Sequence, residues 1–179
     1  MTHATSRRSR VLGTRSALLV VLSVAAVQPT EGQDSRTGAR VRSHSPHIVA
    51  AIARGTAASP TLRRLIDAID VTDGIVYVDE GECGHTVRAC LLPLVQVAGP
   101  NRVLRILVNL RKARDCDLVE VIGHELQHAM EILGDPRIRT DIQAYNFFDV
   151  MGRRPAAGRF ETRAALQIAV VISREACSQ

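Results

Sequence analysis

Two histidines four residues apart, His124 and His128, constrain the fold of this chain more than any other feature. With Glu125 between them they form the pattern H-E-x-x-H. On an α-helix, residues four apart lie on one face, so both imidazoles can reach a single metal ion. The intervening Glu then stands beside that ion, where it can accept a proton from a bound water. The pattern therefore predicts a helix over these residues and a hydrolytic metal site on it.

The residues around the motif predict such a helix. Asp117 is a favourable N-cap residue, and Glu120 follows three positions later in the pattern of a capping box. Gly134 and Pro136 end the helix, which we expect to run from Leu118 to Leu133. One face of this helix is apolar and consists of Leu118, Ile122, Leu126, Ala129 and Leu133. The opposite face carries Val121, His124, His128 and Glu131.

A catalytic zinc site requires three protein ligands and an open position for water, and the motif supplies two. Glu161 is the favoured third ligand, because it lies in an expected final helix, Phe160 to Ala176, whose small Ala residues allow close approach to the motif helix. It would otherwise be an ordinary acid of a first helical turn. Asp141 and Asp149 are the alternative ligands. Glu131 shares the histidine face, but three ligands in a row fit a tetrahedron poorly, so we expect Glu131 to hold an imidazole from behind.

With a strand expected just before it and a Glu on a following helix, the motif His124-Glu125-Leu126-Gln127-His128 resembles the zincin metallopeptidases, specifically the gluzincin branch. The resemblance covers roughly residues 75–165. It implies a zincin-like fold, with a small sheet packed on the active-site helix. It also implies that Zn²⁺ is bound by His124, His128 and Glu161, that Glu125 is the general base, and that the substrate is a peptide or protein.

The resemblance has two further implications. In that family an edge strand beside the site binds extended peptide by strand addition, and here Val103 to Leu110 would be that strand. Family members also stabilise the oxyanion with a His or a Tyr, for which His85 and Tyr145 are the candidates. The residues alone indicate only a hydrolytic metal site. A non-catalytic zinc-binding interaction domain of the cell envelope and a helical structural protein without metal remain the alternatives.

The order of the expected elements predicts the fold class. They run helix, helix, three strands, motif helix and two further helices: 47–58, 59–70, 75–79, 89–97, 103–110, 118–133, 141–151 and 160–176. Pro93 weakens the second strand and favours an edge position or a bulge for it. Because the connections are short, we expect an antiparallel meander, and the class is α+β.

The first 26 residues are predicted to be a signal peptide. A stretch with four arginines precedes the apolar run Ala17 to Val27, and Val24-Ala25-Ala26 offers small residues for cleavage. The run is too short for a permanent bilayer span, although a retained anchor is the alternative. Residues 27–45 are expected to be a flexible linker and residues 46–179 the metallopeptidase domain, secreted or periplasmic, without a stable membrane span.

Four cysteines beyond the leader suggest disulfides in an exported protein. Of the three pairings, Cys83 with Cys90 is the most natural, because it closes a loop between two expected strands, and it leaves Cys116 with Cys177. A second zinc site is the alternative, although no C-x-x-C pair is present. Beyond the leader, 19 basic residues nearly balance 18 acidic ones, so the charge does not indicate nucleic-acid binding.

Overall fold

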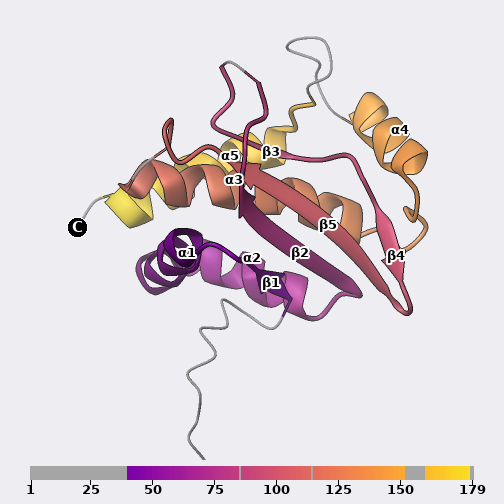
Figure 1. Ribbon diagram of the computed structural model, residues 1–179, viewed down its shortest axis with the longest axis horizontal. Coiled ribbons are helices and arrows are strands. Elements are labelled where there is room, and N and C mark those ends of the chain that lie inside the picture. Colours follow the sequence, from indigo (N-terminus) through magenta and orange to yellow (C-terminus); the bar gives the residue numbers. More distant parts are fainter. Residues whose placement is uncertain (1–39, 85, 114, 152–159, 178–179) are drawn as a thin grey trace, which may run out of the picture. The chain divides into compact units, whose positions relative to one another are not determined.

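The computed structural model describes residues 40–84, 86–113, 115–151 and 160–177. The predicted signal peptide, residues 27–39 of the predicted linker and His85 lie outside these ranges. The described part contains five helices and five strands (Figure 1), so the α+β class is confirmed. They are β1 (Val41–Arg42), α1 (Pro46–Ala58), α2 (Pro60–Asp70), β2 (Gly74–Glu80), β3 (Ala89–Leu91), β4 (Gln96–Ala98), β5 (Asn101–Val108), α3 (Asp115–Leu133), α4 (Asp141–Met151) and α5 (Arg163–Cys177).

The sheet is mixed, so the predicted antiparallel meander is wrong. Its order is β1-β2-β5-β3, with β2 parallel to both β1 and β5. β3 and β4 run antiparallel along the other edge of β5. A meander would place the segment after β2 beside β2. Instead the hairpin that ends in β5 is turned so that β5 lies against β2 and runs in the same direction.

Pro93 explains part of this arrangement. It has no backbone N–H to donate to a neighbouring strand, so the segment that contains it is confined to an edge. The ladder to β5 ends at Leu92, whose N–H donates to Arg105 O at 2.9 Å, and resumes at β4. The edge position predicted for this segment is therefore confirmed, and the single predicted strand is split in two. The prediction that Val103 to Leu110 forms the edge strand is wrong, because β5 is paired on both sides.

One face of the sheet forms the main core. Alternate residues of β2 and β5 are buried on it: Val76, Val78, Leu104, Ile106 and Val108. α3 packs against this face and against α5, where Ala165 and Ala169 are buried. The two helices approach so closely at Gly123 that a Cβ there would lie 2.4 Å from Ile172 Cδ1. The packing of the final helix on the motif helix is as predicted, with two of its Ala residues buried, and Gly123 of α3 makes further room for Ile172.

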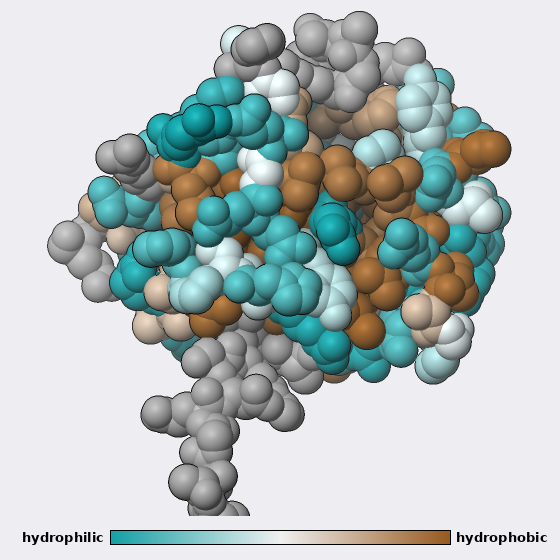
Figure 2. Space-filling model, in the orientation of Figure 1, coloured by the Kyte–Doolittle hydropathy of each residue, from teal (hydrophilic) through white to brown (hydrophobic). Residues whose placement is uncertain are grey.

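The other face of the sheet is less covered. Its residues Ile75, Val103 and Leu107 are half-buried and Arg105 is exposed. Figure 2, in the orientation of Figure 1, shows apolar side chains gathered on the visible face over the sheet. No helix among the described residues is long and apolar enough to cross a membrane.

The N-terminal boundary of the fold lies earlier than predicted. Val41 is fully buried in β1, where it pairs with Val76 of β2. The Ser45 side chain accepts a hydrogen bond from Ile48 N–H and caps α1. Residues 40–45, predicted to be linker, are therefore part of the folded domain.

α3 also begins earlier than predicted, at Asp115, whose φ is 51°. Asp117 therefore lies inside the first turn, and the predicted capping box is wrong. Asp117 and Glu120 instead face Arg88, at 3.8 and 3.1 Å. The end of the helix at Leu133 is as predicted, with Gly134 N–H bonded to Met130 O at 2.8 Å.

A buried arginine secures that end. Arg102 of β5 is 1% exposed and pairs with Asp73. Its guanidinium donates to the last carbonyls of α3 and of the loop beyond, those of Ile132, Leu133, Asp135 and Ile138, at 2.7–3.1 Å. One side chain thus donates to four backbone acceptors at this helix end, two of which, Ile132 O and Asp135 O, also accept a backbone N–H.

Both predicted disulfides are confirmed. Cys83 is bonded to Cys90 and Cys116 to Cys177, with Cα–Cα distances of 5.9 and 5.4 Å. No cysteine is free. The alternative of a second zinc site built from these cysteines is therefore wrong.

Candidate metal centre

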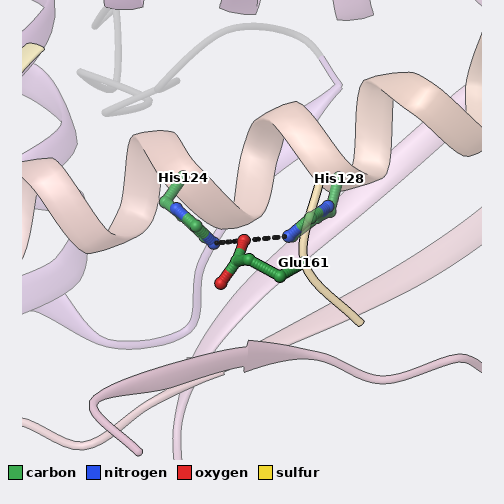
Figure 3. Close-up of side chains that lie close together, drawn as sticks. All are labelled: His124, His128 and Glu161. Carbon is green, nitrogen blue, oxygen red and sulfur yellow. Dashed lines mark ion pairs between the residues drawn. The ribbon is translucent and has the colours of Figure 1, made fainter. Parts of the chain in front are cut away.

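His124, His128 and Glu161 converge on one point (Figure 3). Glu161 Oε1 lies 3.0 Å from His124 Nε2 and 3.4 Å from His128 Nε2. The three ligand atoms all lie within 4.8 Å of one another. In a tetrahedral zinc site with bonds of about 2.1 Å, neighbouring ligand atoms stand roughly 3.4 Å apart. The group therefore has the spacing needed to hold one metal ion.

Two of these atoms are buried without a hydrogen-bond partner, His128 Nε2 and Glu161 Oε1. They lie within ion-pair distance of each other, but the contact lacks hydrogen-bond geometry. A buried polar atom left unsatisfied costs about 1–3 kcal/mol, so such atoms are uncommon unless a ligand satisfies them. A cation bound between the three side chains would satisfy both. The residues present thus fit a metal ion.

The local charge also suits a cation. Burial alone would raise the pKa of Glu161, but His124 and His128 lower it to about 2, so its carboxylate is ionised at neutral pH. Burial alone would lower the pKa of His128, but the carboxylates of Glu131, Glu161 and Glu125 raise it to about 9. These carboxylates therefore keep His128 protonated at neutral pH when no metal ion is bound.

The chain positions Glu161 differently from the prediction. α5 begins at Arg163, so Glu161 lies two residues before the helix, in a single bridge of extended backbone. The residue between them, Thr162, accepts a hydrogen bond from Ala165 N–H at 3.1 Å and acts as the N-cap. Glu161 lies beside the histidines, as predicted. The prediction that it belongs to the final helix is wrong.

Glu131 supports His128 from behind, as predicted. Its Oε2 lies 3.0 Å from His128 Nδ1, and its Oε1 accepts a hydrogen bond of 2.7 Å from Thr162 Oγ1. A carboxylate accepts, so Nδ1 carries the hydrogen. In the neutral ring Nε2 is then left with its lone pair toward the site, which is the tautomer that a metal ion needs.

Glu125 is held beside the ligands by β3. Its side chain is buried, and Oε2 accepts a hydrogen bond from Leu91 N–H at 2.7 Å. Burial raises the pKa of Glu125, and the two neighbouring histidines oppose that rise. Because Leu92 N–H points toward β5, the N–H of Leu91 points away from the sheet. β3, not β5, is therefore the edge strand at the site.

A cavity of about 290 Å³ opens over these residues. One wall is the stretch 86–91 with Pro93, and the other is formed by Phe148 and Phe160. Phe148 packs edge-on against His128, with ring centroids 5.4 Å apart, and stacks on Phe160 at 5.7 Å. This aromatic wall was not predicted from the sequence. Its signal was that four of only five aromatic residues, counting Tyr145 and Phe147, fall between residues 145 and 160.

The other predicted site residues lie elsewhere. Among the described residues, the ligand group includes neither Asp141 nor Asp149, so the structure brings neither of these alternatives to the histidines. Asp141 instead accepts a hydrogen bond of 2.7 Å from Val95 N–H and ties α4 to the segment before β4. Tyr145 packs edge-on against Phe160 and does not line the cavity. His85 lies outside the described residues.

Comparison with known proteins adds no relative: no family model, no curated protein and no solved structure matches this chain. A function for it therefore has to be argued from the site. The strongest features of that site are the ligand group, the buried carboxylate of Glu125 and the cavity above them.

Proposed function

We propose that this protein is a zinc-dependent metallopeptidase of the zincin type, with His124, His128 and Glu161 as the zinc ligands. The observation that carries the proposal is the meeting of Glu161 with a histidine pair 33 positions earlier, around buried atoms without hydrogen bonds. Two imidazoles and one carboxylate with an open fourth position are a ligand set of catalytic zinc. The two disulfides support export to an oxidising compartment.

The residues around the ligands suit hydrolysis. Bound there, zinc supplies Lewis-acid activation of water, whose pKa falls to roughly 7. Glu125 accepts the proton of the attacking water and passes it to the leaving amine. The hydrogen bond from Leu91 N–H fixes the orientation of that carboxylate. Glu131 holds the His128 ring in the tautomer whose Nε2 is free to bind.

The edge of β3 supports an extended peptide as the substrate. Leu92 N–H and Arg88 O face β5, so by alternation the backbone groups of Ala89 and Leu91 face outward. Leu91 N–H is taken by Glu125, while Ala89 N–H and the carbonyls of Ala89 and Leu91 have no hydrogen bond within the described part of the chain and could pair with an added strand. The aromatic side chains of Phe148 and Phe160, which line the cavity, suit an apolar side chain next to the bond that is cleaved.

The test combines zinc content with hydrolysis of a peptide library by wild type, Glu125→Gln and Glu120→Gln. Gln is nearly isosteric with Glu and its Oε1 can still accept from Leu91 N–H, so we expect Glu125→Gln to keep zinc but lose at least about 100-fold in rate. Glu120 lies on the same helix, is paired with Arg88 and does not line the cavity, so Glu120→Gln should remain active.

Three outcomes would count against the proposal. A wild type that takes up no zinc excludes the metal site. An active Glu125→Gln excludes Glu125 as the base. A zinc-loaded wild type that is inert across the library favours the non-catalytic zinc-binding interaction domain.

A further inference from the structure

The hydroxyl of Thr162 connects the two separate parts of the ligand group. Its Oγ1 donates to Glu131 Oε1 at 2.7 Å, and Glu131 Oε2 lies 3.0 Å from His128 Nδ1. Thr162 is also the residue that follows Glu161 in the chain. A path of two hydrogen bonds therefore runs from the backbone that carries the third ligand to the ring that carries the second. Thr162 is 7% exposed, so water competes little for these bonds.

We propose that Thr162 is a positioning residue of the metal site, which acts through Glu131 on the tautomer and orientation of His128. This inference rests on the proposed metal site. The bond from the hydroxyl to Oε1 holds the Glu131 carboxylate in the orientation that also places Oε2 at Nδ1. Without the hydroxyl the carboxylate can turn away, and His128 then loses the group that keeps hydrogen on Nδ1 and the lone pair on Nε2.

Thr162 has a second role that the test must separate from this one. Its Oγ1 also accepts from Ala165 N–H at 3.1 Å and caps α5. A hydroxyl can accept and donate at once, so the cap uses a lone pair and the link to Glu131 uses the proton. Removal of the hydroxyl therefore costs stability through the cap, in addition to any effect on the metal site.

Ser59 provides a matched control for the cap. It is fully buried, caps α2 by accepting from Leu62 N–H at 3.0 Å, and donates its hydroxyl to a glutamate, Glu175. It thus repeats the hydrogen bonds of Thr162, but Glu175 is bonded to Thr61 and Ser59 and not to a metal ligand. Loss of this cap should lower stability and leave zinc affinity unchanged.

The experiment is a zinc titration of the full chain against a competing chelator at pH 7.5. We expect Thr162→Val to weaken zinc binding 10–100-fold, the range typical of residues that support a ligand, and Thr162→Ser to stay within about threefold of wild type. Ser59→Ala should bind like wild type. In the zinc-loaded protein, the His128 Nδ1–H resonance should be protected from exchange in wild type and Thr162→Ser but not in Thr162→Val.

Two results would overturn the inference: Thr162→Val that binds zinc as tightly as wild type, or Ser59→Ala that loses as much affinity as Thr162→Val. If Thr162→Val does not fold, Glu131→Gln, which leaves the cap intact, takes its place, and unchanged affinity with a protected Nδ1–H resonance in that variant overturns the inference as well. A wild type without zinc would instead remove the proposed function. A zinc-binding but inactive wild type would leave the role of Thr162 standing.

Discussion

Glu125 Oε2 accepts a hydrogen bond of 2.7 Å from the backbone N–H of Leu91, so the proposed general base is held by the edge strand of the sheet. That strand has a covalent anchor of its own. Cys90 of β3 is bonded to Cys83, and the stretch between them contributes to the wall of the cavity. The geometry of the proposed base therefore depends on a segment that supplies no metal ligand.

Removal of this anchor should separate catalysis from metal binding. We expect Cys83→Ser/Cys90→Ser to keep zinc affinity, because the three ligands come from α3 and the residue before Thr162. Hydrolysis should fall by up to about 100-fold, the loss that a misplacement of about 1 Å can cause. Zinc titration and peptide hydrolysis of the same preparation measure metal binding and catalysis together. A loss of zinc affinity in parallel with the loss of hydrolysis would contradict this prediction.

Substitution of either motif histidine should abolish tight zinc binding. We expect about one zinc per chain in wild type and almost none in His124→Ala or His128→Ala, because one imidazole and one carboxylate do not complete the site. His44, whose side chain is 75% exposed and paired with Asp79, is the control, and His44→Ala should bind as wild type does. Metal analysis after dialysis measures this, and full retention in the double motif variant would refute the site.

The buried guanidinium of Arg102 should contribute more to stability than any exposed charge of the sheet. Arg102→Met removes the guanidinium that pairs with Asp73 and donates to four carbonyls, so we expect a loss of about 3–5 kcal/mol in the free energy of unfolding. Arg105, two positions along β5 and exposed, is the control, and Arg105→Met should stay within about 0.5 kcal/mol. Urea unfolding measures the free energy of unfolding of both variants. An equal loss in the two would be inconsistent with the role of Arg102.

The zinc-free protein should lose stability as the pH rises from about 6.5 to 9. The pKa of His128 is about 9 in the folded protein, above its ordinary value of 6.5, so the folded state binds its proton more tightly than the unfolded state does. The stabilisation is complete below pH 6.5 and disappears as the pH passes 9. Urea unfolding in the presence of chelator at pH 6, 8 and 10 should show this decline in wild type and not in His128→Gln. The same decline in both would assign it to another group.

The sequence predicted those parts of the site that depend on local structure. The i, i+4 spacing of His124 and His128 is fixed by the helix itself, and the end of that helix follows from Gly134. The role of Glu131 also follows from the helix, because three positions separate it from His128. The place of Glu161 was predicted from the small Ala residues of the helix after it, of which Ala165 and Ala169 are buried.

Features that depend on distant residues could not be predicted in this way. The start of α3 was misplaced because Arg88, from another segment, pairs with the acids that looked like a cap. The predicted strand order was wrong because β5 pairs with β2, a strand more than 20 residues earlier, and no local pattern encodes that pairing. The burial of Arg102 could not be predicted, because in the sequence it resembles any other charged residue. Only the fold brings its guanidinium to the carbonyls at the end of α3.

The Cys116–Cys177 disulfide joins residues 61 positions apart and makes the chain between them a closed covalent ring. The ring contains His124, Glu125, His128, Glu131, Glu161 and Thr162, which is every side chain assigned here to the metal or to its support. A single cut in the backbone of this ring, by any protease, therefore leaves all of them in one molecule at high effective concentration. In the chain-entropy account the intact ring also removes about 4 kcal/mol of unfolded-state freedom, and a cut would end that stabilisation although the site residues stay joined.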